Sequence, residues 1–338
     1  MILRRFVLVA WTLTVLSQAR AACPPRPEPP GSTAETVSGS TIHRFAVDGQ
    51  GTRVAAYAVD GTIMVWNVST GSKRVLQDCH PIKVNALTFD AGGLTLATGD
   101  AEGKLQVFHL PSGAETVIET GRAIDALLFK PASQEIIVAH KGGFSLWSLA
   151  SRRKLWEQPG NAVEALAIDP AGRFLAIGSS GDILVMQAAD GKLYQKIAPK
   201  LGTINSVAFA ADSRRLLVAS ETGVALFDVS SGKPIRRFDT RSDISSMALS
   251  PDDHSLTTVD SNGVVTRWNL KTGAAASQWQ GPSDGIIVNG RFLFSKVPDL
   301  SGLIRVWDIA SQREYRTLDY ISPNANESRL RRSQRPSL

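Results

Sequence analysis

Seven similar stretches decide the fold of this chain: Val65-Trp66-Asn67, Val107-Phe108-His109, Leu146-Trp147-Ser148, Val185-Met186-Gln187, Leu226-Phe227-Asp228, Arg267-Trp268-Asn269 and Val306-Trp307-Asp308. Their central residues lie 42, 39, 39, 41, 41 and 39 residues apart. A nearly constant period of this size indicates a repeated supersecondary unit that buries its faces against its neighbours. Seven such units predict an all-β fold, a seven-bladed β-propeller of four-stranded antiparallel blades.

One repeat shows the predicted unit. Short apolar segments at 84–89, 94–98, 104–110 and 115–119 are separated by turns rich in Gly, Asp and Pro. Strands of this length between such turns are typical of all-β structure. The inner strand of each blade is expected at 42–47, 84–89, 124–129, 163–168, 204–209, 244–249 and a shortened 284–288. The central residues of the seven stretches are predicted to form the structural core of the repeats: Trp66, Phe108, Trp147, Met186, Phe227, Trp268 and Trp307.

The repeats resemble those of the WD-repeat propellers over residues 41–320. The likeness rests on the turn Ser250-Pro251-Asp252, on the segment from Asp60 to Trp66 and on Val306-Trp307-Asp308. The Gly-His dipeptide of that family is absent. The aspartate of its tight turn is kept as Asp60 and replaced in the matching turns by Glu102, Lys141, Ser180, Asn262 and Ser301. The resemblance therefore implies that the family's Asp-His-Ser-Trp hydrogen-bond cluster is mostly missing and that apolar packing holds the blades.

The ends of the chain suggest export. Residues 1–22 combine two early arginines, an apolar run and small residues, which is typical of a signal peptide. Residues 23–40 form a Pro-rich linker, and residues 321–338 are expected to be a disordered basic tail. These features predict a secreted or periplasmic protein. Cys23 is either a lipidation site, a partner of Cys79 in a disulfide, or an ordinary residue of the mature N-terminus.

The formal net charge of +6 comes from the two terminal segments of the chain. The arginines of residues 1–22 and of the tail account for all of it, and the body from 23 to 321 is neutral. A nucleic-acid binding protein needs a clustered basic surface, and the sequence of the body contains no basic run of the kind. Nucleic acid is therefore not expected as a partner, and no cofactor is expected.

One polar residue recurs at the same position of every inner strand: His43, Asn85, Asp125, Glu164, Asn205, Ser245 and Asp284. In the resembling family this position lies near the face where partners bind. Two interpretations stay open: a polar rim that contacts a ligand, or residues that satisfy backbone groups at the strand ends.

The predicted function is a non-enzymatic interaction platform for a protein or peptide, acting as a monomer. The alternative is a metal-dependent propeller hydrolase or lactonase that uses Asp125, Glu164, Asn205 and Asp284 at the channel mouth. How the ring closes is left open. Four strands per blade can be counted without sharing, and the alternative is that residues 33–38 add an outer strand to the last blade beside 313–318.

Overall fold

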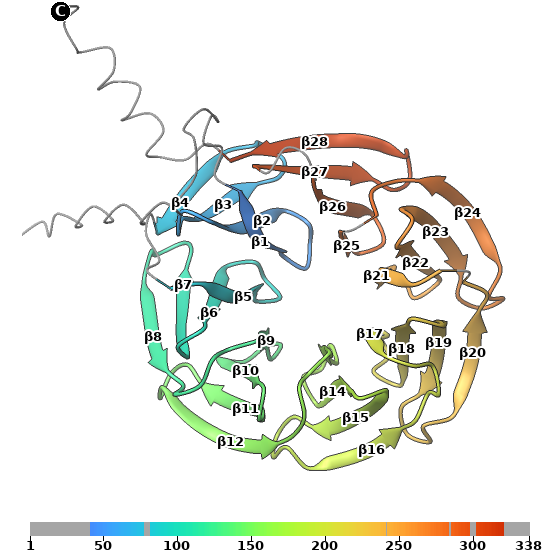
Figure 1. Cartoon of the computed structure of the whole chain (residues 1–338), viewed down its shortest axis with the longest axis horizontal. Helices are drawn as coiled ribbons and strands as arrows, with labels where there is room; N and C mark the ends of the chain where they lie inside the picture. Colours follow the sequence, from blue (N-terminus) through green and yellow to red (C-terminus); the bar gives the residue numbers. More distant parts are fainter. Residues whose placement is uncertain (1–40, 78–81, 241, 284, 298–301, 321–338) are drawn as a thin grey trace, which may run out of the picture. The chain divides into compact units, whose positions relative to one another are not determined.

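The protein is described by a computed structural model that covers residues 41–320 except 78–81, 241, 284 and 298–301. Within these residues, seven four-stranded antiparallel sheets follow one another around a central channel (Figure 1). Each sheet consists of four consecutive strands, and no helix occurs in the described part of the chain. The predicted seven-bladed propeller is confirmed.

The strands follow the repeats of the sequence, with the inner strand of each blade first. Blades 1 to 4 contain β1 (Ile42–Val47), β2 (Arg53–Ala58), β3 (Ile63–Asn67), β4 (Lys73–Gln77); β5 (Val84–Phe89), β6 (Thr95–Asp100), β7 (Lys104–His109), β8 (Glu115–Glu119); β9 (Ala126–Phe129), β10 (Glu135–His140), β11 (Gly143–Ser148), β12 (Arg153–Pro159); and β13 (Ala165–Ile168), β14 (Phe174–Ser179), β15 (Asp182–Gln187), β16 (Leu193–Ile197). Blades 5 to 7 contain β17 (Ile204–Phe209), β18 (Arg215–Ser220), β19 (Gly223–Asp228), β20 (Pro234–Phe238); β21 (Ile244–Leu249), β22 (Ser255–Asp260), β23 (Val264–Asn269), β24 (Ala275–Gln280); and β25 (Ile286–Val288), β26 (Phe292–Lys296), β27 (Leu303–Asp308), β28 (Arg313–Asp319). Four inner strands have the predicted bounds, and β9, β13 and β25 start two residues later than expected.

Aspartates close the first hairpin of several blades. Asp48 accepts the backbone N–H of Thr52 at 2.7 Å, and Asp90 accepts those of Leu94 and Thr95 at 2.8 Å each. Asp169 does the same in blade 4. Because a turn leaves N–H groups without ladder partners, a short carboxylate at the end of the inner strand fixes where each hairpin begins.

The repeat-position residues lie between the blades. Six of their side chains are buried, and Trp307 is partly exposed with no hydrogen-bond partner for its indole N–H among the described residues. A β-bulge separates the repeat residue from the residue before it in five blades, as between Leu146 and Trp147. A bulge increases local twist, so the outer strand of each of these blades can turn away while the large side chain stays inward.

Side chains of neighbouring blades also interlock. Gly99 in β6 faces Ile124 of the next blade, and a Cβ on Gly99 would lie 2.4 Å from Cγ2 of Ile124. The same arrangement recurs between Gly178 in β14 and Ile204, at 2.8 Å. Since a real Cβ needs well over 3 Å, these glycines allow the fully buried isoleucines to enter the neighbouring blade.

The expected loss of the hydrogen-bond cluster needs correction in two blades. The indole N–H of Trp147 donates to Ser145 Oγ, and that of Trp268 donates to Thr258 Oγ1, both at 2.9 Å. The turn carboxylate also survives, two residues earlier than predicted. Asp100 accepts the N–H groups of Glu102 and Lys104, and Asp260 accepts those of Asn262 and Val264. Polar bonds therefore supplement the apolar packing.

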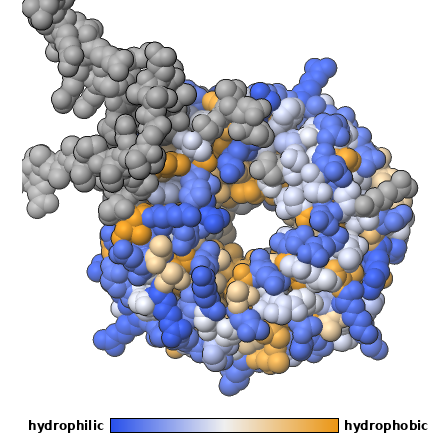
Figure 2. Space-filling model, in the orientation of Figure 1, coloured by the Kyte–Doolittle hydropathy of each residue, from blue (hydrophilic) through white to orange (hydrophobic). Residues whose placement is uncertain are grey.

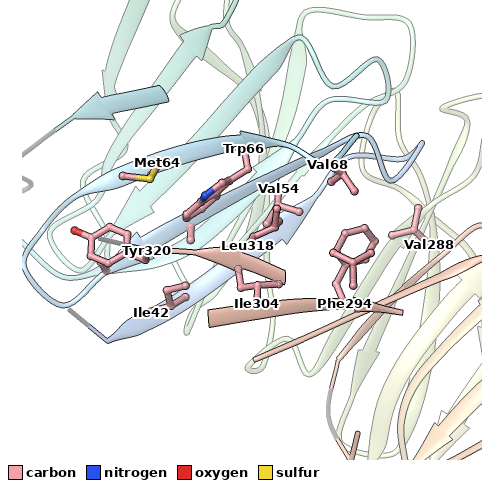
Figure 3. Close-up of a cluster of buried hydrophobic side chains, with 13 residues drawn as sticks. Ile42, Val54, Met64, Trp66, Val68, Val288, Phe294, Ile304, Leu318 and Tyr320 are labelled. Atoms are coloured by element: carbon pink, nitrogen blue, oxygen red, sulfur yellow. The ribbon is translucent and has the colours of Figure 1, made fainter. Parts of the chain in front are cut away.

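The ring closes without an exchanged strand among the described residues. Blade 7 takes its four strands from β25–β28, and it packs on blade 1 through one buried cluster that includes Trp66, Phe294 and Leu318 (Figure 3). The indole N–H of Trp66 donates to the carbonyl of Asp319 at 3.2 Å. The predicted alternative, with residues 33–38 beside β28, lies outside the described residues.

Hydrogen bonds reinforce this closing seam. Tyr320 is 5% exposed and donates its hydroxyl hydrogen to Asp60 Oδ2 at 2.6 Å, and Arg316 donates to the carbonyl of Ser69 at 2.8 Å. Arginine side chains form similar hydrogen bonds to backbone carbonyls between other blades, from Arg74 to Leu110 O and from Arg236 to Thr272 O. The closing seam thus repeats contacts made elsewhere in the ring and adds the tyrosine.

Candidate functional site

The recurring polar position of the inner strands coincides with an irregularity in the ladder. His43, Asn85, Asn205 and Ser245 each occupy a one-residue bulge in the pairing of their inner strand. Asp125 and Glu164 precede β9 and β13, and their N–H groups donate to Ala139 O and Gly178 O at 2.9 Å. Asp284 lies outside the described residues.

The irregularity at this position allows two consecutive residues to lie in different environments, one buried and one facing solvent. The residue before the polar position is apolar and buried between blades in five of the six described cases, as with Ile42 and Ile204. The polar residue itself is half-buried at His43 and Asn85 and exposed at the other four described positions. The extra residue re-aims the side chain toward solvent while its apolar neighbour stays in the core.

Three of these residues form side-chain hydrogen bonds to backbone groups. Asn205 Nδ2 donates to Ile244 O of the next blade at 3.4 Å, and Ser245 Oγ lies 3.1 Å from the carbonyls of Val259 and Ser283. Glu164 Oε1 accepts the N–H of Ser180 at 3.2 Å. In blades 4 to 6 the polar position therefore has the structural role that was one of the two predicted interpretations.

Blades 1 to 3 arrange the same position differently. His43, Asn85 and Asp125 line a shared cavity of about 340 Å³ together with Arg44 and Lys296. The walls come from β1, β5 and β9, and Lys296 is the last residue of β26 in blade 7. These inner strands border the central channel, which Figure 2 shows open and edged by both hydrophilic and hydrophobic residues. We call this cavity the axial mouth.

The axial mouth has an excess of positive charge. Burial lowers the pKa of His43, and the nearby cations Lys83, Arg44 and Lys296 lower it further, so the imidazole is neutral at neutral pH. No ion pair joins these three cations to a carboxylate in the part of the chain that the structure describes. Asp125 is the single carboxylate among the described lining residues. An anionic group would be attracted here and would meet imidazole and amide groups as further hydrogen-bond partners.

Sequence reasoning missed the cations of the axial mouth. Arg44 directly follows His43 and Lys83 lies two residues before Asn85, which is a local signal that the neutral total of the body conceals. Lys296 carries no such signal, because it reaches the cavity from the other end of the chain through ring closure.

The described residues contain no group of three or more His, Cys, Asp or Glu placed to hold a metal ion. Of the residues named for a metal site, Asp125 lies in the cationic axial mouth, whereas Glu164 and Asn205 bond to backbone groups. Asp284, Cys23 and Cys79 lie outside the described residues, as do the predicted signal peptide, linker and tail. No helix in the described part is long and apolar enough to span a membrane.

Fold and site together define a propeller of the WD-repeat type with a cationic, polar opening on its axis. The family model described as "Outer membrane protein assembly factor BamB" matches residues 10–280, well over half of the sequence. The chain belongs to this family. The match ends at the last residue of β24, so it includes blades 1 to 6.

Curated relatives support the WD-repeat resemblance, which is confirmed. The periodic tryptophan protein 2 homolog of Dictyostelium discoideum is 24% identical over 243 residues, covering 68% of this chain and 26% of the relative. The WD repeat-containing protein 91 homolog of the same organism is 23% identical, with coverages of 70% and 27%. The pre-mRNA-processing factor 19 homolog 2 of Arabidopsis thaliana is 26% identical, with coverages of 48% and 33%. The chain spans about a quarter of the length of the first relatives it matches.

The prediction of an exported, secreted or periplasmic location is wrong. Relatives are named for pre-mRNA processing and for association with U3 small nucleolar RNA, and these names point to an intracellular setting rather than an exported one. The N-terminal pattern on which the expectation rested lies in residues 1–22, and the relatives give it no support.

Proposed function

We propose that the protein is a non-enzymatic interaction platform whose axial mouth binds an acidic segment of a protein partner. The observation that carries this proposal is the convergence of His43, Asn85, Asp125 and Lys296 on one cavity from four different blades. A rigid ring that presents side chains from several blades offers a composite surface, which is how such scaffolds generally bind.

The names of the relatives support a role within an assembly. They are called a processing factor, a telomerase protein component and RNA-associated proteins, all terms for parts of larger complexes. A platform that holds a partner in place would perform such a role without chemistry of its own.

The charge of the axial mouth favours this function over a metal-dependent hydrolase. A divalent metal site needs several convergent oxygen ligands, and here one carboxylate is accompanied by Arg44, Lys83 and Lys296. The same cations would repel a metal ion and attract the carboxylates of an acidic peptide. The half-buried imidazole of His43 and the amide of Asn85 supply hydrogen bonds that fix the register of the bound segment.

The test is direct binding of a fluorescently labelled peptide of ten mixed Glu and Asp residues to the whole chain at low salt. We expect saturable binding that weakens as salt is raised, because the attraction is electrostatic. Lys296→Glu should weaken binding by about tenfold or more, since reversing one charge near a bound anion changes the binding free energy by over a kilocalorie per mole. Lys233→Glu, an exposed lysine in blade 5, is the matched control and should leave the affinity unchanged.

Two comparison probes decide between classes of partner. A Lys-rich peptide of the same length should not bind. A single-stranded RNA of ten nucleotides should bind more weakly than the acidic peptide, because Phe45 is the single Phe, Tyr or Trp among the described lining residues, whereas such RNA sites stack successive bases on several aromatic side chains. Tighter binding of the RNA, or equal loss of peptide binding in both lysine variants, would overturn the proposal.

A further inference from the structure

A second cavity lies away from the axial mouth, at the seam between blades 5 and 6. It has a volume of about 450 Å³. Its walls include Asp239 and Thr240, which follow β20 of blade 5, and Thr258, Asp260 and Trp268 from β22 and β23 of blade 6. The lining combines two carboxylates, several hydroxyls and an indole, so the cavity offers both an apolar wall and polar anchors.

The closing seam of the ring shows what fills the corresponding place. Leu318 pairs with Ile304 in blade 7, and Phe238 pairs with Val224 in blade 5, so the two residues hold matching positions. Tyr320 follows Leu318 by two residues, just as Thr240 follows Phe238. The side chain of Tyr320 packs in the buried cluster with Trp66, which occupies the repeat position of Trp268 (Figure 3).

The polar end of Tyr320 is also satisfied. Its hydroxyl donates to a carboxylate of Asp60, in the turn between the second and third strands of blade 1. A phenol between two blades therefore buries its ring and bonds its hydroxyl to the neighbouring turn.

The seam between blades 5 and 6 lacks this ring, and other polar side chains line the open space. Thr240 is much smaller than tyrosine, and its Oγ1 is buried with no hydrogen-bond partner among the described residues. Across the cavity, Asp260 Oδ1 accepts two N–H groups of its turn, and Thr258 Oγ1 accepts the indole N–H of Trp268. The small side chain of Thr240 leaves open the space that the ring of Tyr320 occupies at the closing seam.

We infer that this seam cavity is a receptor for a tyrosine side chain of a partner protein, which enters the place that Tyr320 fills at the closing seam. The aromatic ring lies against Ile244, Val264 and Trp268, and the phenol hydroxyl lies among the polar side chains of Thr258 and Asp260. The cavity volume lies within the range of pockets that enclose small ligands. This site is separate from the axial mouth, and its test is independent of the test of the acidic-peptide proposal.

The probe for the test is p-cresol, the side-chain analogue of tyrosine, titrated into the full chain and followed by NMR of labelled methyl groups. We expect saturable shifts at the methyls of Ile244 and Val264, with intermolecular NOEs from the aromatic protons of p-cresol. Toluene, which lacks the hydroxyl, should bind about tenfold more weakly, as expected for the loss of one buried hydrogen bond. n-Butylamine, the analogue of a lysine side chain, should not bind here.

The decisive variant is Thr240→Tyr, which places a ring where Tyr320 has one. We expect it to abolish the p-cresol shifts and to raise the melting temperature by a few degrees, since it fills the cavity from within the chain. Lys296→Glu, in the axial mouth, is the matched control and should leave p-cresol binding unchanged.

Three results would overturn the inference: equal binding of toluene, preferential binding of n-butylamine, or p-cresol shifts confined to other methyl groups of the wild-type chain. None of these three measurements needs a variant, so the test holds even if Thr240→Tyr does not fold.

Discussion

Replacing Trp66 by alanine should weaken the closing seam far more than the same change at Trp307. Trp66 is 0% exposed, contributes to the cluster between blades 7 and 1 and bonds to the carbonyl of Asp319. A large aromatic side chain buries about 150–250 Å², worth about 4–6 kcal/mol at 25 cal/mol per Å² as an upper estimate. We therefore expect Trp66→Ala to lower the free energy of unfolding by about 4 kcal/mol, as for other core truncations.

Trp307→Ala is the matched control, because both residues hold the repeat position of their blades. Trp307 is partly exposed and its indole N–H has no partner among the described residues, so we expect a loss of about 2 kcal/mol. The assay is urea denaturation followed by far-ultraviolet circular dichroism, with the midpoints compared at unchanged slope. A loss below about 2 kcal/mol for Trp66→Ala, or equal losses in the two variants, would refute the view that the closing seam depends on this buried indole.

Two further predictions concern packing and pH. Gly99→Ala should lower the free energy of unfolding by about 1–3 kcal/mol, because the new methyl group would collide with Ile124. Gly92→Ala is the control: its new methyl group would have no atom nearer than 3.8 Å, so it should change the free energy of unfolding by less than about 0.5 kcal/mol. Similar urea midpoints for the two variants would contradict this prediction. Burial lowers the pKa of His43 and of His140, so the unfolded chain binds protons at a pH where the folded chain does not. The contribution of the two neutral histidines to the free energy of unfolding is therefore fully present above about pH 6.5. It should decrease as the pH falls below that value. Urea midpoints measured from pH 7.5 to 5.5 should show this decrease, and His140→Gln should reduce its slope; a midpoint that rises on acidification would exclude the mechanism.

Part of the candidate site could be predicted because the repeats align its residues. The polar position of the inner strand is visible in sequence as a polar residue after a conspicuous apolar one, as in Ile42-His43 and Val84-Asn85. What this position does is not visible. Asn205 and Ser245 bond to backbone groups of the next blade, whereas His43 and Asn85 line a cavity. The difference depends on side-chain placement across blades, which no local pattern encodes.

The turn carboxylates show a second limit of sequence alignment. Matching the turns by their glycines placed the family's aspartate at Glu102 and Asn262, but the capping carboxylates are Asp100 and Asp260. Both positions lie within the same short turn, and only the hydrogen-bond geometry distinguishes them. The location inferred from the N-terminal pattern is contradicted by the names of the relatives, because that inference used residues 1–22 alone and not the repeats that define the family.

By itself, the sequence determined the number of blades, the strand composition of each blade and the residues at the centre of the repeat. These follow from a period of about forty residues and from the alternation of apolar strands with Gly, Asp and Pro turns, which are local properties of the chain. Only the tertiary structure decided how the ring closes, where Lys296 meets His43, and why the seam beside Thr240 is open while the seam beside Tyr320 is filled. These features join residues that are distant in sequence, and their energies depend on packing between blades that exists only once the ring has formed.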